Sequence, residues 1–176
     1  MREFKADIHI ITSLDDTAWL FNIRGRDIPC NPVVLSYAVI TFDECVLYVG
    51  KNKITDDACK YFSENNITIK DYFSFYDDLK KIESSKNVLL DYERINSAVY
   101  NNIPYEAVKI NKTNPTQDFK AVKNETEIKN IINAHIKDGT AFTKFMYWLK
   151  NNVGKEKSTE IDTAEKRDRK KKKKKK

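Results

Sequence analysis

The sequence predicts an α/β domain whose mixed central sheet of about six strands is flanked by helices. Two observations predict this class. From Ile8 to about Asn114, short apolar runs of β-type residues alternate with helix-like stretches, as in domains with a central sheet. Two of these runs are separated by only Asp43 and Glu44, so we expect them to form a hairpin. A hairpin makes the sheet mixed rather than purely parallel.

The individual elements follow from this alternation. The predicted strands are residues 9–12, 35–42, 45–49, 67–72, 87–91 and 106–110. Helices are predicted between the other strands, at roughly 15–22, 55–65, 73–83 and 93–101. Asp56 and Ser74 suit the starts of the second and third helices, because their side-chain oxygens can accept hydrogen bonds from free backbone amides.

The first helix lies in the stretch SLDDTAWLFNIRG, residues 13–25. We expect Asp15 or Asp16 to cap it. The residues expected to pack against the sheet are Trp19, Leu20 and Phe21. Asn22 to Gly25 are expected to turn the chain, which leaves Arg24 at the exit. Arg24 then either forms local hydrogen bonds or, with Trp19 and Asn22, contacts a neighbouring domain or a cleft.

A long amphipathic helix of about 26 residues, roughly 39 Å, is predicted from Asn124 onward. Asn124 and Glu127 form a capping pair at its start. Gly139, near its middle, predicts the close approach of another backbone. Apolar residues recur along it at spacings of three and four. We name this set the apolar stripe: Ile128, Ile131, Ile132, His135, Ile136, Phe142, Phe145, Met146 and Leu149.

So wide a stripe exceeds what the preceding domain is expected to cover alone. We therefore expect its packing partner to lie outside this sequence, and we expect exposure of the helix to cause self-association.

The net charge of +6 is concentrated at the C-terminus. Residues 166–176 hold ten basic residues and one acidic residue, whereas residues 1–154 are nearly neutral. We expect residues 155–176 to be disordered, because they carry no core-forming pattern. Lys170 to Lys176 would bind polyanions without sequence specificity. A frameshift in an A-rich coding stretch, an artificially added tail or a truncation artefact explains the lysine run equally well.

Several classes of function are excluded or disfavoured. The four glycines are too scattered for a P-loop or a dinucleotide-binding fingerprint. No segment approaches the roughly 20 apolar residues of a membrane span, and no secretion signal is present, so we expect a cytoplasmic protein without membrane contact. Cys30, Cys45 and Cys59 are an odd set without CxxC spacing, which favours reduced thiols.

A metal or catalytic centre is not expected in this chain. His9 and His135 each lack a second ligand at useful spacing, so both are interpreted as packed or hydrogen-bonded core histidines. Paired acidic residues near helix starts or on a polar helix face are interpreted as caps or solvated groups. They are Asp15–Asp16, Asp56–Asp57 and Asp77–Asp78.

Three stretches carry a resemblance to a known family. SLDDTAWLFNIRGRDIPCNPVVLSYAVIT, residues 13–41, closely resembles the middle domain of aminopeptidase P, the Xaa-Pro aminopeptidases of the creatinase/prolidase superfamily. NVLLDYERINSAVYNNIP, residues 87–104, is similar to the family's later strand and helix. Residues 114–149 resemble the passage into the catalytic domain and its first long helix. Thr17 and Arg26 depart from the residues usual in the family.

The resemblance implies an enzyme of three parts: two creatinase-like N-terminal domains and a pita-bread catalytic domain. The catalytic domain binds two divalent metals, manganese or zinc, and removes the N-terminal residue ahead of a proline. Its ligands are two aspartates, a histidine and two glutamates beyond the first catalytic-domain helix. No position of this sequence matches them, so no cofactor is expected in this chain.

The expected organisation follows from the same resemblance. Residues 1–7 would be a remnant or linker, 8–118 the creatinase-like domain, 119–154 the start of the catalytic domain and 155–176 the tail. The expected function is that of a non-catalytic fragment of a metal-dependent Xaa-Pro aminopeptidase, whose partner is the missing catalytic domain. Two alternatives stay open: an interaction module that pairs with a separate catalytic domain, and polyanion binding through the tail.

Overall fold

The computed structural model describes residues 1–154 and 159–172, and the side chains of all of these except 167–172. The chain divides into two compact units, Met1–Ala121 and Val122–Lys176. Each unit is described by itself.

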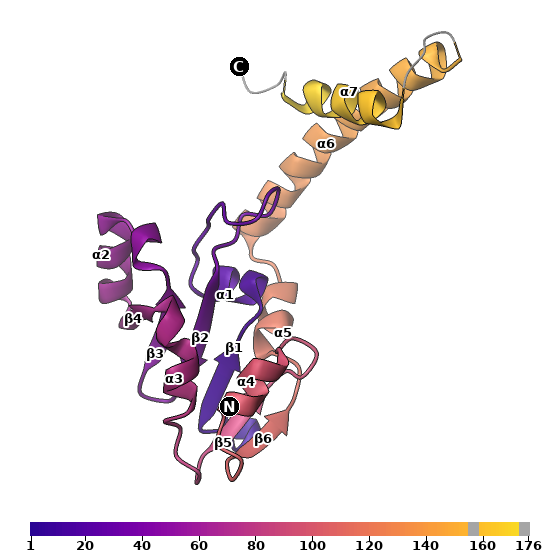
Figure 1. Cartoon of the computed structure of the whole chain (residues 1–176). Helices are drawn as coiled ribbons and strands as arrows, with labels where there is room; N and C mark the ends of the chain where they lie inside the picture. The colour runs from indigo at the N-terminus through magenta and orange to yellow at the C-terminus, as the bar shows by residue number, and fades with distance from the viewer. Residues whose placement is uncertain (155–158, 173–176) are drawn as a thin grey trace. The chain divides into compact units, whose positions relative to one another are not determined.

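The first unit is built on a six-stranded mixed sheet, as predicted (Figure 1). Its strands are β1 (Ile8–Ile11), β2 (Ser36–Ile40), β3 (Cys45–Val49), β4 (Ile67–Asp71), β5 (Asn87–Leu90) and β6 (Val108–Asn111). They lie in the order β4-β3-β2-β1-β5-β6. β2 is antiparallel to both of its neighbours, and the other pairs are parallel.

The predicted hairpin between β2 and β3 is confirmed. Thr41 stabilises its turn, because its hydroxyl oxygen accepts hydrogen bonds from the backbone amides of Asp43 and Glu44 at 3.2 and 2.9 Å. Register within the hairpin pairs Ala38 with Leu47.

Helices cover both faces of the sheet. They are α1 (Leu14–Leu20), α2 (Asp56–Glu64), α3 (Phe75–Leu79), α4 (Ser97–Asn102) and α5 (Pro115–Ala121), with the short 3₁₀ helices η1 (Arg2–Phe4), η2 (Lys51–Lys53) and η3 (Tyr72–Ser74). Strand residues alternate between two cores. Ile10 belongs to the core with Phe75 and Val99 of α3 and α4. Ile11 belongs to the opposite core, with Phe62 of α2 and with Phe21 at the end of α1.

Two predicted helix starts differ in detail from the structure. Thr55, not Asp56, caps α2, since its hydroxyl accepts a hydrogen bond from the amide of Ala58 at 3.3 Å. Ser74 precedes α3 but donates its hydroxyl hydrogen to the carbonyl of Asp71 at 2.7 Å and caps no helical amide. The predicted third helix is therefore split into η3 and a short α3.

Helix α5 was not predicted. Pro115 occupies its first position, where the missing amide hydrogen of proline costs no hydrogen bond. Its seven residues span two turns, which is too short for an apolar period to stand out from a loop.

The long helix of the second unit is α6 (Glu125–Asn152). The predicted capping pair is confirmed: Asn124 and Glu127 exchange side-chain to backbone hydrogen bonds, each of 2.9 Å. A Cβ atom added at Gly139 would meet nothing within 4 Å among the described residues, so the close approach of another backbone there stays a prediction.

The tail differs in part from the expected disorder. Glu160–Lys172 forms helix α7, whose glutamate, alanine, lysine and arginine residues all have good helix propensity. Residues 155–158 and 173–176, also expected to be disordered, lie outside the described residues. α7 contacts α6, and the ammonium of Lys166 lies 3.9 Å from the ring centre of Trp148. In the described part of the chain, no helix is long and apolar enough to cross a membrane.

Candidate functional site

A group of polar side chains lies at one edge of the sheet, which we name the carboxyl edge. Five strands end at this edge, and the antiparallel β2 begins there. At this edge the chain leaves the parallel neighbours β1 and β5 toward opposite faces of the sheet. The chain after β1 packs Phe21 against one face, and the chain after β5 packs Val99 against the other. In open α/β sheets such a switch point is the usual place for a binding site.

A buried polar cluster occupies this switch point. Asn114 lies at its centre, with its Oδ1 3.2 Å from His9 Nε2. The amide nitrogen of its side chain donates to Asp16 at 3.2 Å and to Ser13 at 3.3 Å. The side chain of Asp91 accepts a hydrogen bond from the backbone amide of Asn114 at 3.1 Å.

Lys120 fastens α5 to α1 at the same place. Its ammonium lies 2.6 Å from Asp16, whose side chain is fully buried, and 2.5 Å from Asp15. Burial would raise the pKa of Asp16, but hydrogen bonds from Lys120, Ser13 and Asn114 lower that pKa below its ordinary value.

His9 is a second buried titratable group of this cluster. Burial lowers its pKa from the ordinary value, because the charged form loses its hydration. The prediction of a hydrogen-bonded core histidine is thus confirmed for His9. It is wrong for His135, which is exposed on α6. The polar groups of Asn114, Asp16 and Lys120 are engaged with one another, so the cluster's role is to hold β1, α1 and α5 together.

The predicted contact residues lie at the end of α1 and just after it. Arg24 Nη1 donates to the carbonyls of Ala18 at 2.7 Å and Ile23 at 2.8 Å. This is the local role expected for Arg24, and a cation there also suits the negative end of a helix. Trp19 is half-buried, and Asn22 is exposed with a φ of 51°. An interdomain or cleft contact of these three residues remains a prediction.

The expected packing of Trp19, Leu20 and Phe21 is confirmed only for Phe21, which is 1% exposed and belongs to the sheet core. Leu20 is exposed. The buried residues of α1 are instead Asp16, Thr17 and Ala18, which leaves Leu20 on the exposed side of the helix.

A braced loop, residues 22–35, follows α1 and borders two hollows. Gly25 lies against the return strand of the loop, and a Cβ atom there would stand 2.9 Å from the carbonyl oxygen of Val33. Asp27 accepts hydrogen bonds from the amide of Leu35 at 2.7 Å and from the ammonium of Lys53 at 2.6 Å. The Lys53 hydrogen bond lowers the pKa of Asp27.

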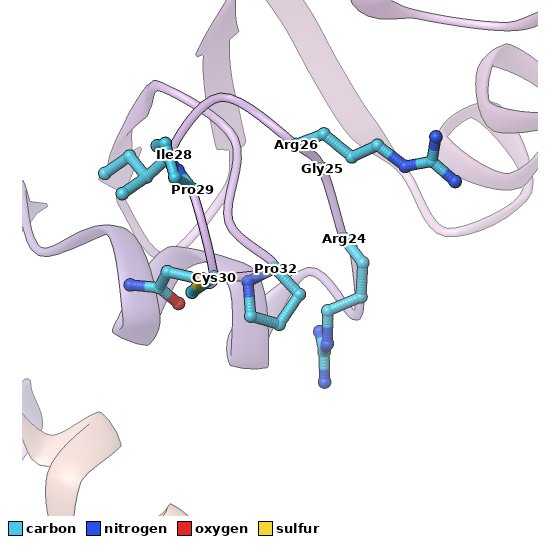
Figure 2. Close-up of a pocket in the computed structure, with 8 residues that line it drawn as sticks. Arg24, Gly25, Arg26, Ile28, Pro29, Cys30 and Pro32 are labelled. Carbon is cyan, nitrogen blue, oxygen red and sulfur yellow. The ribbon is translucent and has the colours of Figure 1, made fainter. Parts of the chain in front are cut away.

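The first hollow has a volume of about 600 Å³. Figure 2 shows its lining, in which the side chains of Arg24 and Arg26 extend away from the loop tip at Ile28 and Pro29. The second hollow, of about 480 Å³, shares Arg24, Gly25 and Arg26 and continues to β3, η2 and α2.

Sequence reasoning missed the part played by Asp27 and Lys53. The aspartate stands among glycine and proline, which signals a turn, but its partner lies 26 positions away in the chain. Only the folded hairpin brings Lys53 next to the loop.

The apolar stripe divides into an exposed first half and a covered second half. Phe145 is 7% exposed, and Met146 and Leu149 are half-buried. The exposed members are Ile128, Ile131, Ile132, His135, Ile136 and Phe142. Within the second unit, the first half of α6 is therefore an apolar face that the described residues of that unit do not cover.

The residues present do not fit the two-metal centre implied by the family resemblance. Among residues 1–154 and the described part of the tail, no three His, Cys, Asp or Glu side chains form a group that could hold a metal ion. No step of metal chemistry is therefore assigned to this chain.

Comparison with known proteins gives consistent matches. The model of the creatinase/prolidase N-terminal domain matches residues 1–127. A probable Xaa-Pro aminopeptidase P of Sordaria macrospora is 34% identical over 172 residues, which cover 92% of this chain and 28% of the relative. Xaa-Pro aminopeptidase 1 of Dictyostelium discoideum is 36% identical over 166 residues, 94% of this chain and 26% of the relative.

A solved structure matches as well. The X-prolyl aminopeptidase of Caenorhabditis elegans, a cytosolic enzyme with a di-nuclear active site, aligns with a TM-score of 0.84 and 30% identity over 96% of this chain and 28% of its own. The chain thus spans about a quarter of the length of the relatives it matches. The match to the family model and the six-stranded mixed sheet lead to the same conclusion: the chain belongs to the creatinase/prolidase N-terminal domain family.

Proposed function

We propose that this chain is the non-catalytic N-terminal-domain part of a cytoplasmic Xaa-Pro aminopeptidase. A catalytic domain would carry out the cleavage ahead of proline and would hold two divalent metals, manganese or zinc. The observation that carries the proposal is the collinear similarity to Xaa-Pro aminopeptidases, at 34% identity over 172 residues. The cytosolic location and the di-nuclear site of the C. elegans enzyme support the same assignment for the parent of this chain.

The exposed half of the apolar stripe is the surface that we assign to the catalytic domain. Ile128, Ile131, Ile132 and Ile136 are 41–62% exposed on one side of α6. Burying each of them against a partner would contribute roughly 1 kcal/mol. A face of this kind, rimmed by the polar residues of the same helix, is typical of a protein interface.

A second contact with the catalytic domain is assigned to the carboxyl edge. Trp19 lies there near the end of α1, and Asn22 and Arg24 lie on the loop that follows it. Their exposed polar groups would face the neighbouring domain or its cleft, while the hydrogen bonds of Arg24 to Ala18 and Ile23 keep the turn in shape.

An activity assay tests this function. The purified chain is incubated with an Xaa-Pro peptide and Mn²⁺ or Zn²⁺, first alone and then with a catalytic domain prepared without its N-terminal domains. We expect no cleavage by the chain alone and a higher cleavage rate of the catalytic domain when the chain is added. Metal-dependent cleavage by the chain alone would disprove the proposal.

A further inference from the structure

The second hollow beside the braced loop has the size and lining of a small-molecule site. Its volume of about 480 Å³ lies within the range of roughly 300–1,000 Å³ that is usual for ligand pockets. Its lining includes apolar side chains of the sheet core and of α2. Val34, Leu47, Val49 and Phe62 form its buried floor, whereas Ile23, Ile54, Ala58 and Tyr61 are half-buried and present apolar surface to it.

The charged groups around this hollow are of two kinds. Three are already engaged: Lys53 pairs with Asp27 at 2.6 Å, and Arg24 donates to backbone carbonyls. Two charged groups remain. Within the described residues, neither the guanidinium of Arg26 nor the carboxylate of Asp57 has a hydrogen bond or an ion pair, and both are exposed.

Both free charges stand on rigid supports. Arg26 lies between Gly25, which is pressed against Val33, and Asp27, which is held from two sides. Asp57 lies in the first turn of α2, which Thr55 caps. Each side chain is thus attached to a backbone position that is already fixed before a ligand binds.

One free cation, one free anion and an apolar lining together match a zwitterion with an apolar body. We propose that this hollow binds short apolar peptides: Arg26 receives the terminal carboxylate, Asp57 the terminal ammonium, and the apolar lining the side chains. A charged hydrogen bond to each terminus would give the site its specificity. This inference concerns a non-catalytic site and does not rest on the proposed function.

Nuclear magnetic resonance titration of the whole chain with L-leucyl-L-leucine tests the site. We expect saturable shifts of the backbone amides of Ile23, Ile54 and Ala58, with a dissociation constant in the millimolar range. The N-acetylated and the C-amidated dipeptides, which each lack one charge, should bind about tenfold more weakly. Absence of saturable shifts at these residues, or equal binding of all three compounds, would overturn the inference.

Matched variants separate the two contacts from general effects on folding. Arg26→Gln and Asp57→Asn should each weaken binding about tenfold. Asp56→Asn removes the neighbouring charge from the same helix turn, and Lys51→Gln removes an exposed cation outside the lining, so both should bind as the parent chain does. If Asp57→Asn and Arg26→Gln match these controls, the assignment of the two charges is wrong.

Discussion

At the scale of single residues, the ion pair between Lys120 and the buried Asp16 illustrates why the switch point is held so firmly. The two residues are 104 positions apart, and their 2.6 Å contact joins α5 to α1. A buried ion pair adds little net stability over an apolar pair, but removal of one partner leaves an uncompensated charge. The pair therefore specifies which helices meet.

Asp16→Asn should lower the free energy of unfolding by about 2–3 kcal/mol, because Lys120 loses its buried partner. Asp15→Asn is the matched control. Asp15 contacts the same ammonium, but 53% of its side chain is exposed, so its loss should cost less than about 1 kcal/mol. Urea denaturation measures both values. Equal losses in the two variants would contradict the assigned role of the buried carboxylate.

The free energy of unfolding should decrease as the pH falls below about 6.5. Burial lowers the pKa of His9 in the folded state, so the unfolded chain takes up the proton first and is favoured by acid. The contribution can reach about 1.4 kcal/mol per pH unit. Urea denaturation of the parent chain and of His9→Gln should be compared between about pH 8 and 5. The free energy of unfolding should decrease less steeply with falling pH in the variant than in the parent chain. Identical slopes would argue against a contribution of His9.

At the scale of elements, the sequence pattern predicted those helices and strands whose bounds depend on residues close together in the chain. β3 was predicted with its observed bounds, because CVLYV is a continuous β-type run, and the start of α6 was predicted because its capping pair lies within four residues. Helix α5 could not be predicted from seven residues. Its place depends on Lys120 meeting an aspartate about a hundred residues earlier.

The candidate sites also differ in whether they are formed by neighbouring residues or by segments distant in the chain. The apolar stripe was readable because its spacing repeats along one helix, whereas the hollow beside the loop was not. That hollow is formed by the loop, β3 and α2, which are brought together only by the sheet. Likewise, the neighbouring sequence does not distinguish Arg24 from Arg26. Arg24 donates a hydrogen bond to a carbonyl at the end of α1, whereas Arg26 has no partner among the described residues.

The same substitution should have opposite effects in two elements. Gly139→Ala should stabilise α6 by up to about 1 kcal/mol, because alanine favours helix and a Cβ atom there meets open space. Gly25→Ala should destabilise the first unit by about 1–3 kcal/mol, since its Cβ would press on Val33. Thermal unfolding followed by circular dichroism compares the two. A lower melting temperature for Gly139→Ala would indicate that a backbone does approach this glycine.

At the scale of the whole molecule, charge and apolar surface lie in different parts. The first 154 residues are nearly neutral, and the net positive charge is concentrated in the last eleven. The apolar stripe lies on α6, ahead of that basic segment. The two predicted partners, a catalytic domain and polyanions, would therefore bind separate segments.

Deletion of residues 166–176 should abolish retention of the chain on heparin or DNA, because ten of the basic residues are removed. Before deletion, the affinity should fall roughly a thousandfold between about 50 and 200 mM salt, as counterion release requires. Deletion of residues 155–165, which hold more acidic than basic residues, is the matched control and should leave retention intact. Retention that survives the first deletion would place the binding elsewhere.

The central claim is that the exposed half of the apolar stripe receives a catalytic domain. The most direct measurement is the calorimetric affinity of the chain for an Xaa-Pro aminopeptidase catalytic domain that lacks its N-terminal domains. We expect binding that Ile132→Asp weakens at least about tenfold and that Asn130→Asp, a substitution on the opposite side of α6, leaves unchanged. No binding, or equal affinity of the two variants, would contradict the account.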